Sequence, residues 1–528
     1  MFYMGKIIIV AKGVFFLFLG GVLFLILQIL LKPARYGTVD YYDETTRQLE
    51  GFYDEKMDSI DIVFLGTSHM NAGLIPMELY KEYGLKSYNL ATSAQPIEAS
   101  YYLLKEALKT QSPSLCVIDA SGLWIEEPQE YAWRYVIDNI KSDLSMLQLA
   151  KMYYQCDFDQ LLTYGFPAFY YHDRWKSLEF QDFMEFRRNK HFFSKGNLIF
   201  SLQRVNPASI DVDFMNEEAN RLEDSQQYVF SKLESKRIDW LLKIAELCRQ
   251  NNIEILVTKI PAIYHVADYG SAWTRKKSDI TKEVCANHHI PYYDMLYDVD
   301  VNLDWSTDTV DGGMHLNYRG GKKVTSCIGA YIVDEYEIAG SNDNIWDVDF
   351  AIYSKMKDVI ELQMQGEFEN YIKGLQGWED NDIAVLIATA DTYNTGLHVE
   401  ELNELVKLGL NTDFMSEQNK AYVAVIRSGR VIYEASAADI TEYDWYVGKV
   451  ACTLSSAGPE GGSAASIQIG GQEYAIGARG FNVVVYDCEK NLVLDSKCFD
   501  TYEFVHKVLI DNQLVYAMDV ENYLIENK

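Results

Sequence analysis

The chain has 528 residues, of which 48% are hydrophobic and 13% aromatic. This length exceeds one ordinary core, so two or more domains are expected, and the composition excludes a disordered protein. The 47 basic and 77 acidic residues give a formal net charge of -30, and such a surface repels polyanions, so we exclude nucleic-acid binding.

The N-terminus carries an uncharged, apolar stretch from Gly13 to Leu31. At ~1.5 Å per residue, a helix of this stretch is roughly 30 Å long, enough to cross the hydrocarbon core of a membrane. A cleaved signal peptide usually has a shorter apolar core, about 7 to 15 residues, and a small-residue cleavage site, which residues 31–35 do not offer. We therefore expect residues 1–35 to form a cytoplasmic tip and a single-pass anchor in the cell membrane. Basic residues flank both ends, so the extracellular location of the bulk rests on the usual arrangement of signal-anchors.

Between residues 36 and 375, short apolar runs alternate with segments of helical length. The runs expected to be strands are Ile60–Leu65, Ser87–Leu90, Leu115–Asp119, Ile253–Thr258 and Pro291–Asp294. The clearest helix is Lys232–Asn251, whose apolar residues recur on one face. This rhythm predicts a three-layer α/β/α domain with a parallel sheet covered on both faces. Ligands of such sheets bind beyond the carboxyl ends of the strands, where Ser68 is expected.

Residues 122–230 interrupt this alternation with an insertion of aromatic and mixed-charge composition. Its notable side chains are Trp124, Trp133, Arg134, Tyr170, Tyr171 and Trp175. One interpretation is a roof over the site, because specificity on a recurrent fold usually resides in loops and insertions. An accessory helical subdomain that packs its own aromatics is an equal alternative. Arg134 either binds an anionic substrate group or forms a structural ion pair.

Beyond about residue 375 the pattern becomes β-rich, and we place a second domain of mixed α+β type at 378–528. Its expected elements are the strands Ile383–Thr389, Ala421–Arg427, Val431–Glu434, Ser466–Ile469 and Val483–Tyr486 and the helix Val399–Leu408. Glycine-rich turns separate the strands. The eight cysteines of the chain are scattered and match neither a zinc site nor a disulfide scaffold. Cys488 and Cys498 flank an expected hairpin and could be bridged.

Three residues have the chemistry of a serine hydrolase. Ser68 follows the first apolar run, in Gly66-Thr67-Ser68-His69, while Asp311 and His315 stand four positions apart near the end of the same domain. A serine hydroxyl is a poor nucleophile until a base removes its proton, and a histidine held by a carboxylate is the usual base. Ser68 could instead cap the following helix, and Asp311 and His315 could be a surface pair. Together they favour a catalytic site, and no metal or cofactor is implied.

The order of these residues resembles the SGNH (GDSL-like) hydrolase superfamily, in which the first block carries the serine and the last block the aspartate and histidine. The resemblance implies that Ser68 is the nucleophile, His315 the general base and Asp311 the residue that orients it. Many members separate the aspartate and histidine by two residues, whereas three intervene here. Asp308 or Asp304 is therefore an alternative to Asp311.

The oxyanion hole of that superfamily normally combines the serine N–H, a glycine N–H and an asparagine side chain. The third block of this chain, residues 119–122, contains no asparagine. Loss of one oxyanion donor can cost ~100 to 1,000-fold in rate. The Ser93 N–H and Gln95 are the candidate donors, and His69 and Asn89 are further candidates for the oxyanion hole or the pocket lining.

More narrowly, residues 61–69, 88–91 and 311–318 are similar to membrane-anchored SGNH-like proteins of Gram-positive bacteria. These are related in layout to the D-alanine transfer protein of teichoic acid modification and to alginate O-acetylation proteins. The resemblance covers about residues 55–370 and implies action on ester-linked acyl groups of a cell-surface glycan. It also implies a multi-pass membrane-bound O-acyltransferase as partner, because one anchor helix cannot carry a charged acyl donor across the bilayer.

The C-terminal domain has a resemblance of its own. The segments Ile383–Val385, Tyr422–Ile426, Arg479–Val485 and Phe499–Thr501 look like the interleukin-like EMT inducer domain, and this implies carbohydrate binding. A structural β-rich module without a ligand is the alternative.

The sequence thus predicts a membrane-anchored O-acyltransferase or esterase that forms an acyl-serine at Ser68. Transferase and hydrolase differ in whether water is excluded, which the sequence does not decide. The alternative from another class is a non-catalytic glycan-binding or assembly protein on the same fold. The incomplete oxyanion pattern favours that alternative, and the intact Ser68, Asp311 and His315 oppose it.

Overall fold

The computed structural model divides the chain into two compact units. The first is formed by Met1–Tyr353 and the second by Ser354–Leu524. The structure describes residues 2–32, 48–125, 129–141, 143–178, 183, 191–197, 233, 235–262, 270–305, 307–310, 313–378, 382–416 and 419–510.

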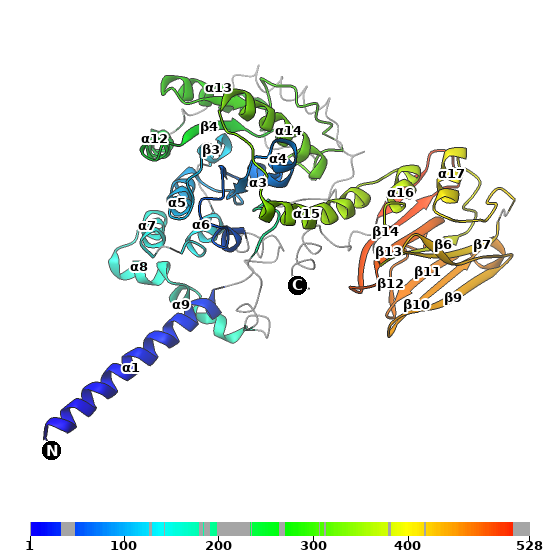
Figure 1. The fold of residues 1–528 in the computed structure, drawn as a ribbon, viewed down its shortest axis with the longest axis horizontal. Coiled ribbons are helices and arrows are strands. Elements are labelled where there is room, and N and C mark those ends of the chain that lie inside the picture. The colour runs from blue at the N-terminus through cyan, green and yellow to red at the C-terminus, as the bar shows by residue number, and fades with distance from the viewer. Residues whose placement is uncertain are drawn as a thin grey trace. The chain divides into compact units, whose positions relative to one another are not determined.

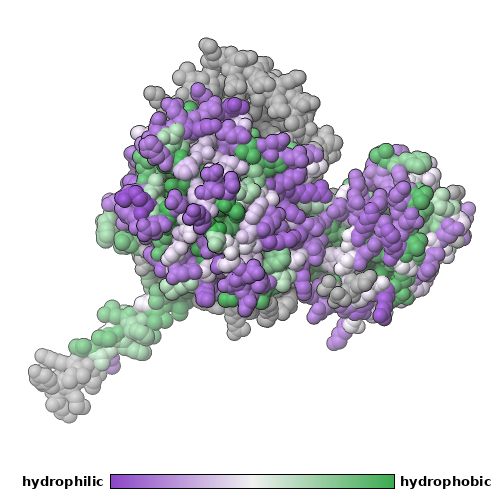
Figure 2. Space-filling model, turned by 45° about the horizontal axis from the view of Figure 1, so that its top comes forward, coloured by the Kyte–Doolittle hydropathy of each residue, from purple (hydrophilic) through white to green (hydrophobic). Residues whose placement is uncertain are grey.

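The first unit begins with α1 (Phe2–Leu31), whose segment Val10–Leu31 is long and apolar enough to cross a membrane. Most side chains of residues 10–26 are exposed, for example Phe16 at 75% and Leu17 at 74%, and Figure 2 shows the coloured part of this helix as hydrophobic. Exposed apolar area on this scale is unfavourable in water. By length and composition, α1 fits a membrane anchor or a signal sequence.

The end of α1 packs on the short helices of the insertion. The Arg174 guanidinium of η2 (His172–Lys176) donates to the carbonyl oxygens of Leu30, Leu31 and Lys32. The last carbonyls of a helix have no partner within the helix, so Arg174 satisfies carbonyls at the end of α1 and holds that end against η2.

A five-stranded parallel sheet forms the centre of the first unit, in the order β2-β1-β3-β4-β5. Figure 1 labels two of its strands, β3 and β4. Its strands are β1 (Ile62–Leu65), β2 (Ser87–Asn89), β3 (Leu115–Asp119), β4 (Glu254–Lys259) and β5 (Tyr292–Asp294). Every pairing is parallel, so all five carboxyl ends lie at one edge of the sheet. The expected parallel sheet is confirmed.

Helices cover both faces of this sheet. They are α3 (Ser68–Gly73), α4 (Pro76–Tyr83), α5 (Ile97–Ala107), α12 (Ser235–Gln250), α13 (Gly270–Asn287) and α14 (Tyr318–Glu335). Because successive side chains of a strand point to opposite faces, Val63 and Leu65 join the core under α5 and α12, whereas Ile62 and Phe64 join the core under α4 and α14. All four residues of β1 are buried, and the predicted three-layer α/β/α architecture is confirmed.

The described residues of the predicted insertion form short helices. These are η1 (Ala120–Trp124), α6 (Glu130–Ile137), α7 (Asp143–Tyr154), α8 (Phe158–Gly165), α9 (Pro167–Tyr170) and η2. Their aromatic rings pack on one another: the ring centroids of Tyr154 and Tyr164 are 4.0 Å apart and those of Trp133 and Tyr153 are 5.2 Å apart. Residues 198–230 lie outside the described residues.

The second unit is built on a ten-stranded sheet. Its main path runs β12-β11-β10-β6-β13-β14-β15, with β7 between β6 and β8 and with β9 beside β10. The strands are β6 (Ile383–Ala390), β7 (Ala421–Arg427), β8 (Arg430–Ala437), β9 (Ile440–Val447), β10 (Val450–Ala457), β11 (Ala464–Ile469), β12 (Gln472–Glu473), β13 (Gly480–Asp487), β14 (Leu492–Asp500) and β15 (Lys507–Ile510). The helices are the end of α15 (Asn344–Gln363), α16 (Phe368–Leu375), α17 (Val399–Lys407) and η6 (Pro459–Gly461). The β-rich character expected of this region is confirmed, and all eight cysteines of the chain, including Cys488 and Cys498, are free thiols.

The second unit starts within α15, whereas the sequence placed the second domain at 378–528. The ammonium of Lys497, in β14, is buried and donates to the carbonyl oxygens of Leu362, Gln363 and Gln365. The ring of Phe368 lies 5.1 Å from that of Phe499. These contacts place residues 354–377 in the same core as the strands.

Candidate active site

Ser68 is the first residue of α3, directly beyond the carboxyl end of β1. The N-cap of α3 is Thr67, whose hydroxyl accepts a hydrogen bond from the backbone N–H of His69. The side chain of Ser68 does not cap the helix, since its Oγ lies 2.8 Å from Nε2 of His315. The helix-cap interpretation of Ser68 therefore gives way to a serine paired with a histidine 247 residues later in the chain.

Asp119, at the end of β3, holds the turn that presents Ser68. Its carboxylate accepts hydrogen bonds from the Thr67 hydroxyl at 2.5 Å and from the Thr67 N–H at 3.3 Å. The other carboxylate oxygen accepts the Ser121 N–H at 3.0 Å. Gly66 allows this approach, because a Cβ on residue 66 would lie 2.4 Å from Cβ of Asp119. A buried carboxylate with several donors fixes the turn.

His315 lies in a loop that closes on itself in front of α14. Thr309 and Leu316 form an isolated antiparallel bridge, and the Val310 N–H donates to the carbonyl of His315 at 2.9 Å. Asn317 caps α14 through its side-chain oxygen and donates from its amide to the carbonyl of Thr307. These bonds hold the imidazole toward the edge of the sheet where β1 ends.

Ser68 and His315 open into one cavity of about 410 Å³, here called the Ser68 cavity. Its walls come from the ends of β1, β3 and β4 and from η1, α6 and α13, and include Trp124, Ile125, Tyr131 and Met314. The first residues of the insertion thus form part of the cavity wall. The site lies at the carboxyl edge of the parallel sheet, as α/β sheets dispose their ligands.

The three aspartates that are candidates for orienting His315 differ in their positions and partners. Asp311 lies outside the described residues. The Asp308 carboxylate is buried, accepts the Asp304 N–H at 2.8 Å and pairs with Lys323 at 2.7 Å. Asp304 itself is exposed. Asp308 therefore has other partners for its charge, and Asp311 stays the predicted orienting residue.

The candidates for the oxyanion hole also separate. Ser93 and His69 line the Ser68 cavity. The Gln95 side chain is buried between Thr92 and Ser100, accepting from the first and donating to the second. The Asn89 amide donates to the carbonyls of Met70 and Leu74. Gln95 and Asn89 are thus structural supports beneath the site.

Arg134 lies in the insertion, away from the lining of the Ser68 cavity. Its guanidinium pairs with the buried Asp138, donates to the carbonyl of Tyr164 and stacks over the ring of Tyr170 at 4.1 Å. Burial acts to lower the pKa of Arg134, but Asp138, Tyr171 and Tyr154 together raise it above its usual value. The structure therefore matches the predicted structural ion pair.

Lys259 and Ser121 line the Ser68 cavity and are polar residues that the sequence did not single out as candidates. Nζ of Lys259 donates to Oγ of Ser121 at 3.0 Å, and this Oγ lies 3.3 Å from Nδ1 of His69. Burial, together with the charges of Lys259 and His315, holds the pKa of His69 well below its usual value, so this imidazole is neutral. The available signal was a charged residue directly after the apolar run 253–258, at the ligand-binding edge of the sheet.

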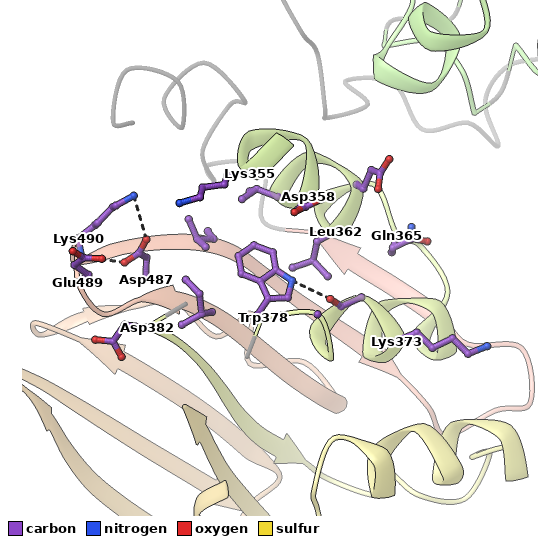
Figure 3. A pocket seen from close by; sticks show the side chains of 16 residues that line it. Lys355, Asp358, Leu362, Gln365, Lys373, Trp378, Asp382, Asp487, Glu489 and Lys490 are labelled. Carbon is purple, nitrogen blue, oxygen red and sulfur yellow. Dashed lines mark hydrogen bonds and ion pairs between the residues drawn. The ribbon is translucent and has the colours of Figure 1, made fainter. Parts of the chain in front are cut away.

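Two further features lie in the second unit. Among the described residues, the side chains of His398, Glu401 and His506 place ligand atoms within 4.8 Å of one another and could hold a metal ion. A cavity of about 640 Å³, here called the Trp378 cavity, is walled by Trp378 and by charged side chains of both signs (Figure 3).

No protein-family model matches the sequence, and no curated protein is significantly similar to it. Among solved structures, the chain is similar to a proposed acylhydrolase from Bacteroides fragilis, with 12% identity and a TM-score of 0.28 over 57% of this chain and 99% of that chain. It is also similar to a GDSL-like lipase from Bacteroides thetaiotaomicron, with 11% identity and a TM-score of 0.28 over 55% of this chain and 98% of that chain. At these values no activity is transferred, and the site stands on its own geometry.

Proposed function

We propose that the first unit is a serine-dependent esterase or O-acyltransferase of SGNH type. The observation that carries this proposal is the 2.8 Å separation between Oγ of Ser68 and Nε2 of His315. The two residues come from opposite ends of the α/β domain and meet beside a cavity at the carboxyl edge of its sheet. A serine within hydrogen-bond reach of an imidazole is the basic unit of nucleophilic acyl transfer.

The proposed reaction has two halves. Oγ of Ser68 attacks the ester carbonyl carbon while Nε2 of His315 takes the hydroxyl proton. The bond from the carbonyl carbon to the ester oxygen then breaks, the alcohol leaves with the proton from His315, and the acyl group stays on Ser68. In the second half, water or a sugar hydroxyl attacks the acyl carbon while His315 takes its proton. The bond from the acyl carbon to Oγ then breaks, and Oγ of Ser68 regains a proton from His315. Asp311 is the proposed orienting residue of His315.

A fluorophosphonate probe tests this proposal on the full-length protein in mild detergent. Only an activated serine displaces fluoride from such a probe, so we expect the wild type to be labelled at Ser68. Ser68→Ala should abolish labelling and His315→Ala should slow it at least ~1,000-fold, because the two residues act as one unit. Ser177→Ala, which changes an exposed serine of the first unit, is the control. An unlabelled wild type would favour the non-catalytic alternative.

The sequence resemblances supply the finer part of the proposal. We propose that the substrate is an acylated cell-surface glycan and that α1 anchors the chain beside a multi-pass acyltransferase that delivers the acyl group. Purification from the native membrane with α1 intact, and again with α1 replaced by an unrelated anchor, tests the partner. A protein that purifies alone and hydrolyses acylated glycans unaided would be an esterase without this partner.

For the second unit we propose that the Trp378 cavity holds the glycan. The indole Nε1 of Trp378 donates to the carbonyl of Gly374 at 2.9 Å, which orients the ring, and carboxylates and lysines surround it. An aromatic face beside polar groups offers a sugar both an apolar surface and hydrogen bonds. A glycan array should give signals that Trp378→Ala removes. An array without signal for the folded wild type would leave the second unit as a structural module.

A further inference from the structure

The Ser68 cavity is cationic in a strongly acidic protein. The charged or titratable side chains among the described residues of its lining are Lys259, Lys277, His69 and His315, together with the tyrosines, and no carboxylate is among them. The whole chain has a formal net charge of -30. The Trp378 cavity, by contrast, is walled by five carboxylates and three lysines. The charge of the Ser68 cavity is therefore opposite to that of the chain, as a site for an anion requires.

Lys259 is the more deeply buried of the two lysines. It ends β4, it is 6% exposed, and its Nζ donates to Oγ of Ser121 at 3.0 Å. An ammonium group has three N–H donors. Among the described residues, Ser121 is its one hydrogen-bond acceptor. Two donors therefore have no acceptor in the part of the chain that the structure describes, at a position where an unsatisfied charge is costly.

The nearest carboxylates do not neutralise this charge by direct contact. Asp119 uses its oxygens for Thr67 and the Ser121 N–H. Asp294 accepts the backbone N–H groups of residues 296 and 297 and the hydroxyl groups of residues 278 and 292. Burial lowers the pKa of Lys259, while the charges of Asp119 and Asp294 oppose that effect from a distance. An anion in the cavity would supply the missing acceptors.

The cavity also offers room for the remainder of a substrate. Trp124, Ile125 and Met314 provide apolar walls. Through Ser121, Lys259 is connected to His69, whose ring centroid lies 5.5 Å from that of His315. A group bound at Lys259 therefore shares one cavity with the Ser68–His315 pair.

We propose that the Ser68 cavity binds a negatively charged group of the substrate, a carboxylate or a phosphate, at Lys259 while the scissile acyl ester lies at Ser68. The inference rests on the proposed function of Ser68 and adds the substrate class: an ester that also carries an anion. Lys259 is a specificity-determining residue in this scheme, since the ester reacts at Ser68 and the anion is held by Lys259.

The test compares three esters on the full-length protein in mild detergent. These are neutral 4-nitrophenyl acetate, 4-acetoxybenzoate with a carboxylate, and 4-acetoxyphenyl phosphate. The wild type should prefer one or both anionic esters, and the two anionic arms distinguish a carboxylate from a phosphate. Lys259→Met should lower kcat/KM for the preferred anionic ester by about 10 to 100-fold, mainly through KM, because it removes a charged hydrogen bond. Its loss of rate on the neutral ester and its loss of fluorophosphonate labelling should each be at least about threefold smaller than its loss on the preferred anionic ester.

Lys259→Gln, which keeps a donor for Ser121, and Lys109→Met, which changes a lysine with 49% side-chain exposure, are the matched controls. A purely structural role of Lys259 would lower the thermal midpoint of Lys259→Met, whereas loss of an uncompensated buried charge should leave it unchanged or raise it.

Three outcomes would overturn the proposal: a wild type without preference for anionic esters, an equal loss on all three esters with slower labelling, or a lowered midpoint with unchanged preference. If the wild type is not labelled at all, the proposed function of Ser68 fails separately. Calorimetric binding of 4-hydroxybenzoate and of phenyl phosphate then still tests the anion site, because Lys259→Met should abolish it.

Discussion

At the scale of single residues, three consecutive residues of the turn after β1 have different roles. Gly66 lets the backbone approach Asp119, Thr67 caps α3 and binds Asp119, and Ser68 is left to meet His315. Each residue type is needed for a different physical reason: absence of a Cβ, a short side chain that both donates and accepts, and a hydroxyl that reaches the imidazole. The nucleophile is thus positioned by a carboxylate that it does not touch.

Gly66→Ala is expected to disturb this turn. The added Cβ would lie 2.4 Å from Cβ of the buried Asp119, and overpacking of this kind typically costs about 1 to 3 kcal/mol. We expect a lower thermal midpoint and at least ~10-fold slower fluorophosphonate labelling of Ser68. Gly377→Ala is the control, since a Cβ there meets nothing within 4 Å. Unchanged labelling of Gly66→Ala would show that the turn tolerates displacement.

At the scale of elements, residues 191–197 close the edge of the sheet beside β2. The Asn89 N–H donates to the carbonyl of Lys195 at 2.9 Å, and the Gly196 carbonyl accepts from the amides of Gln48 and Asn71. An uncovered edge strand presents unpaired backbone groups, and this segment satisfies one of them, the Asn89 N–H. It is anchored in turn by Lys195 and His191, which both bind Asp349 at 2.7 Å.

This anchor should make folding stability depend on pH. The hydrogen bond to Asp349 raises the pKa of His191 above its usual value. A raised pKa in the folded state means that the stabilisation is fully present below about pH 6.5 and is lost as the pH rises through the folded value. The thermal midpoint of the wild type should therefore fall more between about pH 6 and pH 9 than that of His191→Gln.

His288→Gln, which changes an exposed histidine, should behave as the wild type in this comparison. Equal pH dependence of the wild type and His191→Gln would mean that the pair with Asp349 does not contribute to stability.

The acid side of the dependence of stability on pH is set by Asp349. Burial would raise its pKa, but His191 and Lys195 together hold that pKa below the usual value. Its contribution is therefore lost only in acid, as the pH falls below about 4.

At the scale of the whole molecule, the chain contains two units whose boundary falls inside a helix. α15 begins in the first unit and ends in the second. The end of α15 and α16 supply the second unit with acceptors for Lys497 and with the ring of Phe368. The sequence placed the domain boundary near residue 375, where the pattern becomes β-rich, and a boundary there divides the core of the second unit.

Two fragments test where the second unit begins. Residues 354–528 should fold cooperatively, whereas residues 378–528 should be unfolded or melt at least about 10 °C lower, because a buried ammonium loses its acceptors. Circular dichroism during heating measures both. Adding Lys497→Met to the shorter fragment should recover part of the loss. Equal melting of the two fragments would place the boundary at residue 378, as the sequence predicted.

The sequence by itself determined the elements whose signal is local. β1 was predictable because four consecutive apolar residues precede a glycine. α1 was predictable because an uncharged, apolar stretch of that length is typical of a helix that can cross a membrane. The pairing of Ser68 with His315 was predictable from residue types and from the rule that parallel strands end at one edge. These features depend on neighbours in the chain or on the direction of the strands.

Only the tertiary structure decided the roles of residues whose partners are distant in the chain. From residue type alone, lysines are expected at the surface. Lys259 and Lys497 are nevertheless buried, and their ammonium groups donate to Ser121, 138 residues away, and to Leu362, 135 residues away. The sequence likewise made Gln95 and Asn89 candidates for the site. In the structure, the Gln95 side chain bonds to Thr92 and Ser100, and the Asn89 side chain bonds to two backbone carbonyls of residues 70 and 74. Burial of a polar group is stable only where its partners converge in space, and no local sequence pattern encodes that convergence.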